Sequence, residues 1–369
     1  MKKTVGAVIL CALFQFLVSV NCQAAFQRGL FVSVIQNPPV LSNRQTIKDL
    51  VRFAKRSRIQ TLFVQIYREN KAWFPSQVGD STPYRACLKN VSEDPFALLI
   101  KEAHASGIEV HAWLNLMSLS VNENAPLLKK YGPEILTRNL KEKKTLQDYK
   151  IDDQYFLEPG DLRVREELSK IVTEVVSTYP DLDGLQFDYI RYPDRHPAYG
   201  FTKMNSERFK RASGQSVIKE ESAEWKDWKR EQVTGLLRLL SKKARSIRPK
   251  IQISTTGLVP YSRASLEAFQ DWKYWLQNGL VDFITLMCYS ADTQEVKKNI
   301  ADAKNKIGNL SKVNIAVGAY KLLRSPDIFE EQFQICEHSD GRACVTFHYG
   351  DLVQNPALAK LLIGENKTK

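Results

Sequence analysis

Short β-rich runs alternate with amphipathic helical segments along nearly the whole chain. In the first helical segment, Ile47, Leu50, Val51 and Ala54 recur at the spacing of one helix face. The eight β-rich runs cover residues 28–34, 61–67, 108–116, 181–188, 250–257, 282–289, 314–320 and 343–350. Eight strands that alternate with helices predict the α/β class and a single parallel (β/α)8 barrel, the TIM barrel, with insertions in its βα loops.

An open, doubly wound parallel sheet is the alternative for this alternation. That fold carries a glycine-rich phosphate-binding turn after its first strand, and no such turn follows residues 28–34. The barrel is therefore favoured. Residues 193–222 form a long polar stretch after the fourth strand, which predicts an insertion with room for one helix.

The N-terminal residues resemble an export signal. Lys2 and Lys3 precede an apolar stretch at 5–20, and Cys22-Gln23-Ala24 is similar to a small-x-small cleavage site. We therefore expect a signal peptide at 1–24, a mature barrel at 25–369, and a periplasmic or secreted protein. The alternative is a lipoprotein, in which Cys22 becomes a lipid-modified first residue that anchors the protein in the outer membrane.

The chain is basic, which bears on its partners. Its formal net charge is +12, and removal of residues 1–24 takes away two lysines and no acidic residue, which leaves +10. A basic exported protein suits an anionic polymer such as cell-wall glycan, although charge also serves solubility alone. No stretch has the aromatic and glycine pattern of a nucleic-acid-binding module, so no nucleic-acid partner is expected. The oligomeric state is left open.

Four cysteines follow residue 24 and allow three pairings in an oxidising compartment. Cys336 and Cys344 flank a short segment with a turn signal at 340–341, which favours a local disulfide. Cys87 would then pair with Cys288. Neither pair has the spacing of structural zinc ligands, so no metal site is expected.

Polar and aromatic residues gather at the C-terminal ends of the predicted strands, where TIM barrels carry their active sites. These ends read QIYREN, AWLNLM, QFDYIRY, LMCYS and FHYGD, and they predict a ligand cleft. Trp113 lies midway along its strand and is assigned to the core. The predicted substrate-binding residues are Tyr67, Arg68, Asn115, Gln186, Tyr189, Arg191, Tyr192, Tyr289 and His348.

Asp188 ends the fourth predicted strand. Because side chains alternate along a strand, Gln186 and Asp188 point to the barrel axis if Leu185 and Phe187 face the helices. A carboxylate at that position can act as nucleophile or base on a sugar, or stabilise an oxocarbenium-like centre. Arg191 would keep it ionised. The alternative is a structural ion pair between Asp188 and Arg191.

The residues around Asp188 are partly similar to the chitinase strand-four motif, Asp-Gly-x-Asp-x-Asp-x-Glu. Asp183, Gly184 and Asp188 match it, but Gln186 replaces the middle aspartate and Ile190 replaces the glutamate. The substrate-assisted chitinase mechanism needs that glutamate. The chitinase assignment is therefore rejected.

A second resemblance covers nearly all of the chain after residue 24. The segments RGLFVSV, LIKEAHASGIEVHAWLN, FLEPGDLRVREEL, DGLQFDYIRYP and QDWKYWLQNGLVDFITLMCY stand in this order. In these motifs the chain resembles the bacterial glycosyl-hydrolase-like 10 family, whose members are exported, often lipid-anchored barrel proteins similar to glycosidases acting on peptidoglycan glycan strands. The resemblance implies a (β/α)8 fold, hydrolysis of glycosidic bonds and no obligatory redox cofactor.

Two positions depart from the family pattern. Tyr189 follows Asp188 where the family carries a second acid, and Glu158 makes the usual LNPG or LDPG element read LEPG. Glycoside hydrolysis commonly uses two carboxyl groups. The second group is predicted to be Glu158 or Glu69, with Asp194 as a third choice. For Glu158, the structural alternative is capping of a helix N-terminus.

Three hypotheses about function follow. The leading one is an exported glycoside hydrolase that cleaves a polysaccharide, with peptidoglycan glycan strands as the expected substrate and Asp188 as the central catalytic residue. The second is a non-catalytic glycan-binding barrel at the cell envelope, since one acid of the family pattern is missing. The third is a metal-dependent deacetylase, which five singly scattered histidines disfavour.

Overall fold

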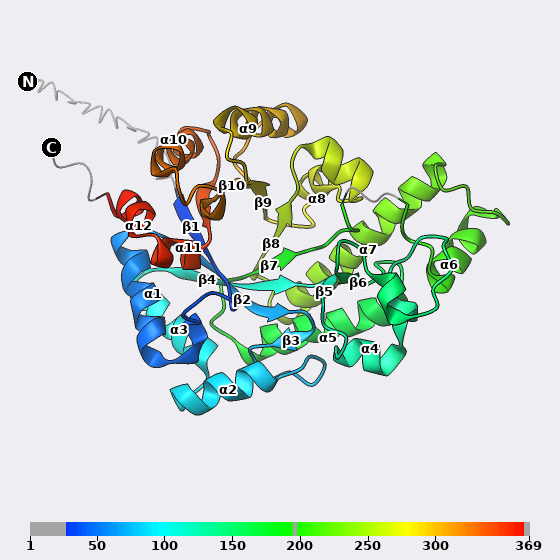
Figure 1. Ribbon diagram of the computed structural model, residues 1–369, viewed down its shortest axis with the longest axis horizontal. Coiled ribbons are helices and arrows are strands. Elements are labelled where there is room, and N and C mark those ends of the chain that lie inside the picture. The colour runs from blue at the N-terminus through cyan, green and yellow to red at the C-terminus, as the bar shows by residue number, and fades with distance from the viewer. Residues whose placement is uncertain (1–26, 195–197, 365–369) are drawn as a thin grey trace, which may run out of the picture.

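The eight apolar runs form the strands of one closed parallel barrel (Figure 1). The computed structural model describes residues 27–194 and 198–364, so the expected signal peptide and Cys22 lie outside the described residues. β1 closes the sheet because it pairs with both neighbours, with Gly29 opposite Thr61 of β2 and Gln27 opposite Ala343 of β11. The barrel strands are β1 (Gln27–Val32), β2 (Thr61–Arg68), β4 (Glu109–Asn115), β7 (Gly184–Asp188), β8 (Gln252–Gly257), β9 (Phe283–Cys288), β10 (Val313–Gly318) and β11 (Ala343–Phe347). The predicted TIM barrel is confirmed, and the open doubly wound sheet is excluded.

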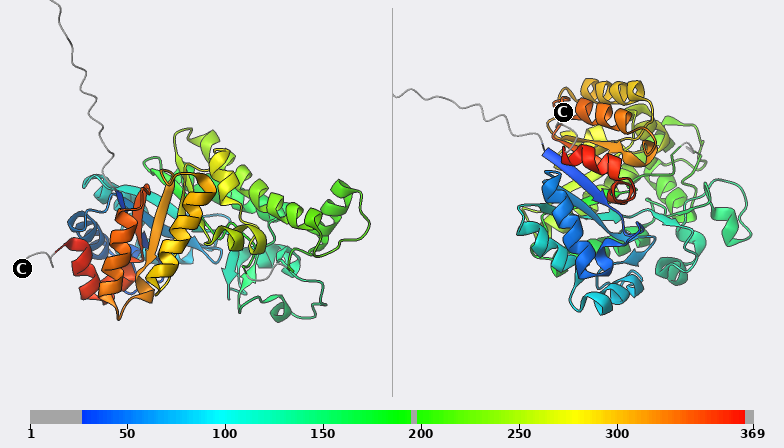
Figure 2. Two further views of the ribbon diagram at one scale, coloured as in Figure 1. Left: turned by 90° about the horizontal axis from the view of Figure 1, so that it is seen from above. Right: turned by 60° about the vertical axis from the view of Figure 1, so that its left-hand side comes forward.

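Helices connect successive strands and cover the outside of the barrel (Figures 1 and 2). Local sequence explains where they begin. The Asp94 carboxylate caps the second connecting helix, because its Oδ1 accepts from the backbone N–H groups of Phe96 at 3.0 Å and Ala97 at 2.8 Å. The helices are α1 (Arg44–Arg56), α3 (Pro95–His104), α5 (Leu162–Thr178), α7 (Ala223–Ile247), α8 (Trp272–Gln277), α9 (Thr293–Ile307) and α10 (Pro326–Glu337), with α11 (Tyr349–Gln354) and α12 (Pro356–Ile363) after the last strand.

The strands separate two apolar layers. Leu185 and Phe187 of β7 belong to the large cluster that the strands and helices share. Gln186 faces the other way, and Ser254 Oγ donates to its Oε1 at 2.5 Å inside the barrel. A separate cluster fills the interior and consists of Phe31, Phe63, Trp113, Phe283, Ala316, Ala343 and Val345. The alternation expected along the fourth strand is therefore present.

Three βα loops carry insertions. Those after β4 and β7 extend one side of the molecule, where Figure 1 shows α4, α6 and the β5–β6 pair beyond the barrel, whereas α2 lies beside α3. α6 falls within the polar stretch at 193–222. A small cluster of Phe201, Phe209 and Trp225 holds α6 against α7. The inserted elements are β3 (Lys71–Ala72) and α2 (Thr82–Val91) after β2, β5 (Ser118–Ser120), α4 (Pro126–Tyr131) and β6 (Tyr155–Phe156) after β4, and α6 (Lys203–Ser213) after β7.

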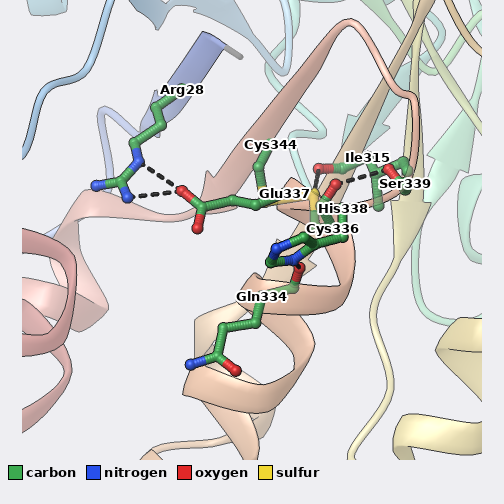
Figure 3. Close-up of a disulfide and its surroundings, with 8 residues drawn as sticks. All are labelled: Arg28, Ile315, Gln334, Cys336, Glu337, His338, Ser339 and Cys344. Atoms are coloured by element: carbon green, nitrogen blue, oxygen red, sulfur yellow. Dashed lines mark hydrogen bonds and ion pairs between the residues drawn. A yellow bond between two sulfur atoms is a disulfide. The ribbon is translucent and has the colours of Figure 1, made fainter. Parts of the chain in front are cut away.

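Cys336 at the end of α10 and Cys344 in β11 form a disulfide with Cα atoms 5.6 Å apart (Figure 3). The intervening segment turns tightly, with Asp340 at a positive φ of 54° and the Ser339 hydroxyl donating to the Cys336 carbonyl at 2.6 Å. The predicted local disulfide is confirmed. Beside it, the Arg28 guanidinium at the start of β1 bonds to the Glu337 carboxylate at 2.6 Å (Figure 3).

The second expected disulfide is wrong, because Cys87 and Cys288 are both free. Cys87 lies in α2, which packs against η1 (Val40–Ser42), β3 and α3. Cys288 is buried at the end of β9, between β8 and β10. The two thiols therefore belong to different parts of the barrel wall. No helix in 27–194 or 198–364 has the length and apolar character needed to cross a membrane.

Candidate active site

The carboxyl ends of all eight barrel strands meet around one cavity of about 620 Å³. Ligand sites in proteins commonly span ~300 to 1,000 Å³, so the cavity can take a small chain of sugars. It lies where the polar strand ends predict a ligand cleft. Each strand or the residues directly after it contribute to the lining, in chain order Ser33, Arg68, Asn115, Asp188, Leu258, Met287, Lys321 and His348.

Asp188 lines this cavity with a carboxylate held by three donors. Trp113 Nε1 donates to Oδ2 at 3.0 Å, and Oδ1 accepts from Thr256 Oγ1 at 2.5 Å and from the Tyr189 backbone N–H at 2.8 Å. Hydrogen bonds of this kind fix the direction of both carboxylate oxygens. Only 5% of Asp188 is exposed, so this charge acts in a site where water screens little.

Trp113 is a site residue that sequence reasoning assigned to the core. Its ring belongs to the interior cluster, but one edge lines the cavity and its N–H reaches Asp188. Alternation along β4 is the signal that points to this position. Asn115 was placed at the mouth, and Trp113, two residues earlier, lies on the same face of the strand.

The chain turns sharply after Asp188. Tyr189 has a positive φ of 57°, a strained region for an aromatic residue and one that recurs at functional sites. This turn stacks the Arg191 guanidinium over the Tyr189 ring at 4.5 Å. The expected pair between Arg191 and Asp188 is not formed within the described chain, because Arg191 donates to Asp194 Oδ1 at 2.8 Å instead.

Asp194 is the second carboxylate of the cavity, and two arginines share it. Arg191 binds one oxygen and Arg263 binds the other. Burial opposes the charge of Asp194, but the two guanidinium groups outweigh it and hold the pKa of this carboxyl below its usual value. Asp194 therefore carries no proton at neutral pH and is unsuited to the role of general acid.

Five aromatic rings pack together in the lining of the cavity. Burial and the nearby charge of Asp188 raise the pKa of Tyr289 well above its ordinary value, so its hydroxyl stays protonated and is a hydrogen-bond donor. A sugar ring can stack on such a wall with its apolar face. Neighbouring ring centroids are 5.0 to 6.0 Å apart, and the rings are those of Phe31, Trp113, Tyr289, Tyr320 and Phe347.

His348 both lines the cavity and supports its own loop. Its Nδ1 accepts from the Gly350 backbone N–H at 3.0 Å, which places the ring proton on Nε2, 3.6 Å from Asp351. Burial lowers the pKa of this imidazole, although Asp351 opposes the shift. His348 is therefore neutral at pH 7 and presents no charge to a ligand.

Comparison with protein families identifies this barrel. The family model described as Glycosyl hydrolase-like 10 matches residues 27–334. The chain belongs to this family. Two curated relatives carry the name glycosyl hydrolase. DigH of Escherichia coli strain K12 is 25% identical over 302 residues, covering 71% of this chain and 65% of the relative. YngK of Bacillus subtilis strain 168 is 23% identical over 270 residues, covering 68% of this chain and 50% of the relative.

Solved structures share the fold of this glycosyl hydrolase-like 10 protein. The catalytic domain of β-amylase from Paenibacillus polymyxa aligns with a TM-score of 0.57 at 11% identity, covering 93% of this chain and 99% of the other. The β-galactosidase from psychrophilic Marinomonas ef1 aligns with a TM-score of 0.58 at 10% identity, covering 92% of this chain and 58% of the other. At such low identity the agreement concerns the barrel architecture alone.

The structure brings together most of the predicted binding residues. Tyr192 and Gln186 do not line the cavity, and neither does Tyr67. Gln186 lies deeper in the barrel, where it bonds to Ser254. The predicted binding residues that do line the cavity are Arg68, Asn115, Tyr189, Arg191, Tyr289 and His348.

A β-bulge explains why Tyr67 points away from the cavity. The register of β2 against β4 shifts between Gln65 and Tyr67, so Gln65 lies opposite Trp113 whereas Tyr67 lies opposite Leu114. Gln65 therefore lines the cavity. Tyr67 joins the outer apolar cluster, where its hydroxyl accepts from Asn70 at 2.8 Å and burial raises its pKa.

Glu158 does not reach the cavity either. It is completely buried beside Tyr192, whose hydroxyl donates to Glu158 Oε1, and the Gly160 N–H donates to the same oxygen at 3.0 Å. Burial raises the pKa of Glu158, although these donors oppose the shift. Asp161, not Glu158, caps α5, since its Oδ1 accepts from the Arg163 N–H at 2.9 Å. Glu158 and Tyr192 thus brace the loop that carries Arg191.

Glu69 lies at the border of the cavity without lining it. Its Oε1 accepts from Arg68 Nε at 2.7 Å and its Oε2 is 3.7 Å from Lys71 Nζ. Its backbone has a positive φ of 58°, which turns the side chain beside that of Arg68. Across 27–194 and 198–364, no group of three His, Cys, Asp or Glu side chains is arranged to hold a metal ion.

Proposed function

We propose that this protein is a glycoside hydrolase that cleaves glycosidic bonds in a polysaccharide. The observation that supports this most is Asp188, a carboxylate of fixed orientation in the strand-end cavity of a glycosyl hydrolase-like 10 chain. Such a carboxylate attacks the anomeric carbon as a nucleophile or activates a water as a base. It also stabilises the positive charge that develops on the sugar ring in the transition state.

The walls of the cavity suit a sugar chain. The rings of Trp113 and Tyr289 offer flat apolar faces, and the Tyr289 hydroxyl offers a donor close to Asp188. Sugars present apolar C–H faces and polar hydroxyl edges, so a cavity lined by both aromatic rings and polar groups matches both.

Hydrolysis also needs a group that protonates the leaving oxygen. Asp194 is held charged by its two arginines, and Glu158 is enclosed away from the cavity. We assign the acid role to Glu69, since its carboxylate contacts Arg68, which lines the cavity. In this role, the Glu69 side chain leaves Arg68 and turns to the leaving oxygen when substrate binds.

A second candidate function is glycan binding without hydrolysis. It is favoured by the cationic partners of the remaining carboxylates, because Asp194 bonds to two arginines and Glu69 lies between Arg68 and Lys71. The two arginines hold the pKa of Asp194 below its usual value, so Asp194 resists protonation. In this reading Asp188 binds a sugar hydroxyl and no bond is broken.

We further propose that the protein acts outside the cytoplasm on peptidoglycan glycan strands. The basic and apolar character of residues 1–24 supports export, and the charge of +10 that follows their removal supports an anionic polymer as the target. The resemblance to glycosidases acting on peptidoglycan supports this polymer in particular.

The decisive experiment measures reducing ends released from purified sacculi. We expect Asp188→Asn to lose at least about a thousandfold in turnover, because the carboxylate is lost while the shape is kept. Glu69→Gln should lose turnover on sacculi but keep it on an aryl glycoside, whose leaving group needs no proton. Asp227→Asn, an exposed residue of α7, is the control.

Two outcomes would contradict the hydrolase. Full release of reducing ends by Asp188→Asn would remove the assigned centre. Saturable binding to sacculi by both the native protein and Asp188→Asn, with no release by either, would establish the glycan-binding function instead.

A further inference from the structure

The cavity carries more positive than negative charge. Neutral sugars are recognised by hydrogen bonds and aromatic faces, so an excess of cations in a sugar site needs a cause in the ligand. Among the described residues, the lining has four cations, Arg68, Arg191, Arg263 and Lys321, and two carboxylates, Asp188 and Asp194.

Arg191 and Arg263 are not satisfied by the protein alone. Arg191 is 8% exposed and uses one nitrogen for Asp194, while its buried Nε has no hydrogen-bond partner in the described chain. The buried Nε of Arg263 likewise lacks a partner there. Buried N–H groups are nearly always paired in folded proteins, so these two guanidinium groups keep hydrogen-bonding capacity that the described chain does not use.

Asp194 orients these two arginines but neutralises only one of their two positive charges. One carboxylate shared by two guanidinium groups leaves the trio with a net charge of +1. A second trio lies at the border, where Glu69 is shared by Arg68 and Lys71 and again leaves +1. Guanidinium groups match carboxylates in geometry because they can donate two parallel hydrogen bonds.

We propose that the cavity selects a glycan whose sugars carry carboxylate groups. The carboxylate binds at Arg68 and at the trio of Arg191, Asp194 and Arg263, while the sugar ring lies on the aromatic rings of the lining. This inference rests on the proposed glycan function of the same cavity and specifies which chemical class of glycan enters it. Arg68 is the cation best suited to a test, because its removal leaves the Arg191–Asp194–Arg263 trio intact.

The test compares one polymer in two forms. Glycan strands from sacculi are first freed of their peptides with an amidase, which leaves the carboxylates of their sugars free. They are then used intact, or after carbodiimide activation and borohydride reduction of these carboxylates to alcohols. For the native protein we expect KM to rise about tenfold or more on reduction, the effect of losing charge-assisted hydrogen bonds, with little change in kcat. Rising ionic strength should raise KM for the intact strands only.

Variants connect this effect to the arginines. Arg68→Gln should raise KM for intact strands by a similar factor and show no further loss with reduced strands. Arg263→Gln is the second variant, with circular dichroism to check its fold. Arg52→Gln removes an exposed cation of α1 that pairs with Asp49 and should match the native protein.

The outcomes separate this inference from the proposed hydrolase. Equal KM values for both strand forms would overturn carboxylate selection and leave glycoside hydrolysis standing. If neither form is hydrolysed, the equilibrium binding of intact and reduced strands tests carboxylate selection. Preference for intact strands that is lost in Arg68→Gln supports selection without catalysis, and equal binding or none overturns it.

Discussion

Trp113 connects the interior packing of the barrel to the chemistry of Asp188. Its ring packs against Phe31 with centroids 5.0 Å apart, and its N–H donates to Asp188 Oδ2 at 3.0 Å. Trp113→Phe keeps an aromatic ring and removes the donor. We expect kcat to fall about tenfold or more, the value of a hydrogen bond to a charged group, with a smaller change in KM. Initial rates on sacculi measure both. An unchanged kcat would mean that this donor does not orient the carboxylate.

Glu158 gives the protein a stability that depends on pH. Burial raises its pKa above the ordinary 4.5, so the native state keeps the proton at pH values where the unfolded chain has lost it. The unfolded state then binds fewer protons, and the free energy of unfolding contributed by Glu158 falls as pH rises upward from about 4.5. Glu158→Gln keeps an acceptor for Tyr192 and removes the titration.

We therefore expect Glu158→Gln to gain stability relative to the native protein between pH 4.5 and neutrality. Urea unfolding at a series of pH values measures the difference between the two free energies. Glu166→Gln, an exposed position on α5, is the control and should follow the native profile. Parallel profiles for Glu158→Gln and the native protein would contradict a raised pKa.

At the scale of elements, the barrel strands were predictable because each is a short apolar run between helical segments. Fully buried parallel strands need such runs, and helix ends such as the Asp94 cap mark the intervals between them. The β-bulge in β2 was not predictable. It leaves no compositional trace, yet it moves Tyr67 to the outer face and Gln65 to the cavity.

The candidate site was predictable at the strand ends and in the residues that closely follow them. Asp188 and Asn115 end their strands and line the cavity as expected. Glu158 and Tyr192 lie in loops, where no periodicity reports direction, and their mutual hydrogen bond turns both away from the cavity. Pairings such as Arg191 with Asp194 depend on the strained turn at Tyr189, which a sequence pattern does not reveal.

The disulfide contributes stability at the edge of the barrel far along the strand from the cavity. Cys344 lies near the start of β11, whereas the cavity residues Phe347 and His348 lie at and beyond its end. Loop-closure entropy predicts that Cys336→Ala with Cys344→Ala lowers the free energy of unfolding by about 2 to 3 kcal/mol. Turnover on sacculi should be retained at temperatures where the variant is folded. Urea unfolding with and without reductant measures the change, and reductant should not affect the double variant.

At the scale of the whole molecule, the positive charge is distributed in a way that suits an anionic polymer. The chain keeps a charge of +10 without residues 1–24, and part of this excess of cations lies in the cavity lining. A field of one sign over a protein raises the local concentration of an oppositely charged polymer. A polymer in the cell wall is reached only by a protein that leaves the cytoplasm, so substrate and export are linked in this proposal.

Export is therefore the last prediction. In fractionated bacteria that express the full chain, we expect the protein in the periplasm or medium, with mass spectrometry showing that residues 1–24 have been removed. Deletion of 2–24 should retain it in the cytoplasm. Cys22→Ser separates the two modes of export. A soluble protein will be unaffected by this change, whereas a lipoprotein will lose its membrane association and its processed, lipid-bearing N-terminus. Recovery of the unprocessed full chain from the cytoplasm would refute export, and with it the cell wall as the place where this barrel meets its glycan.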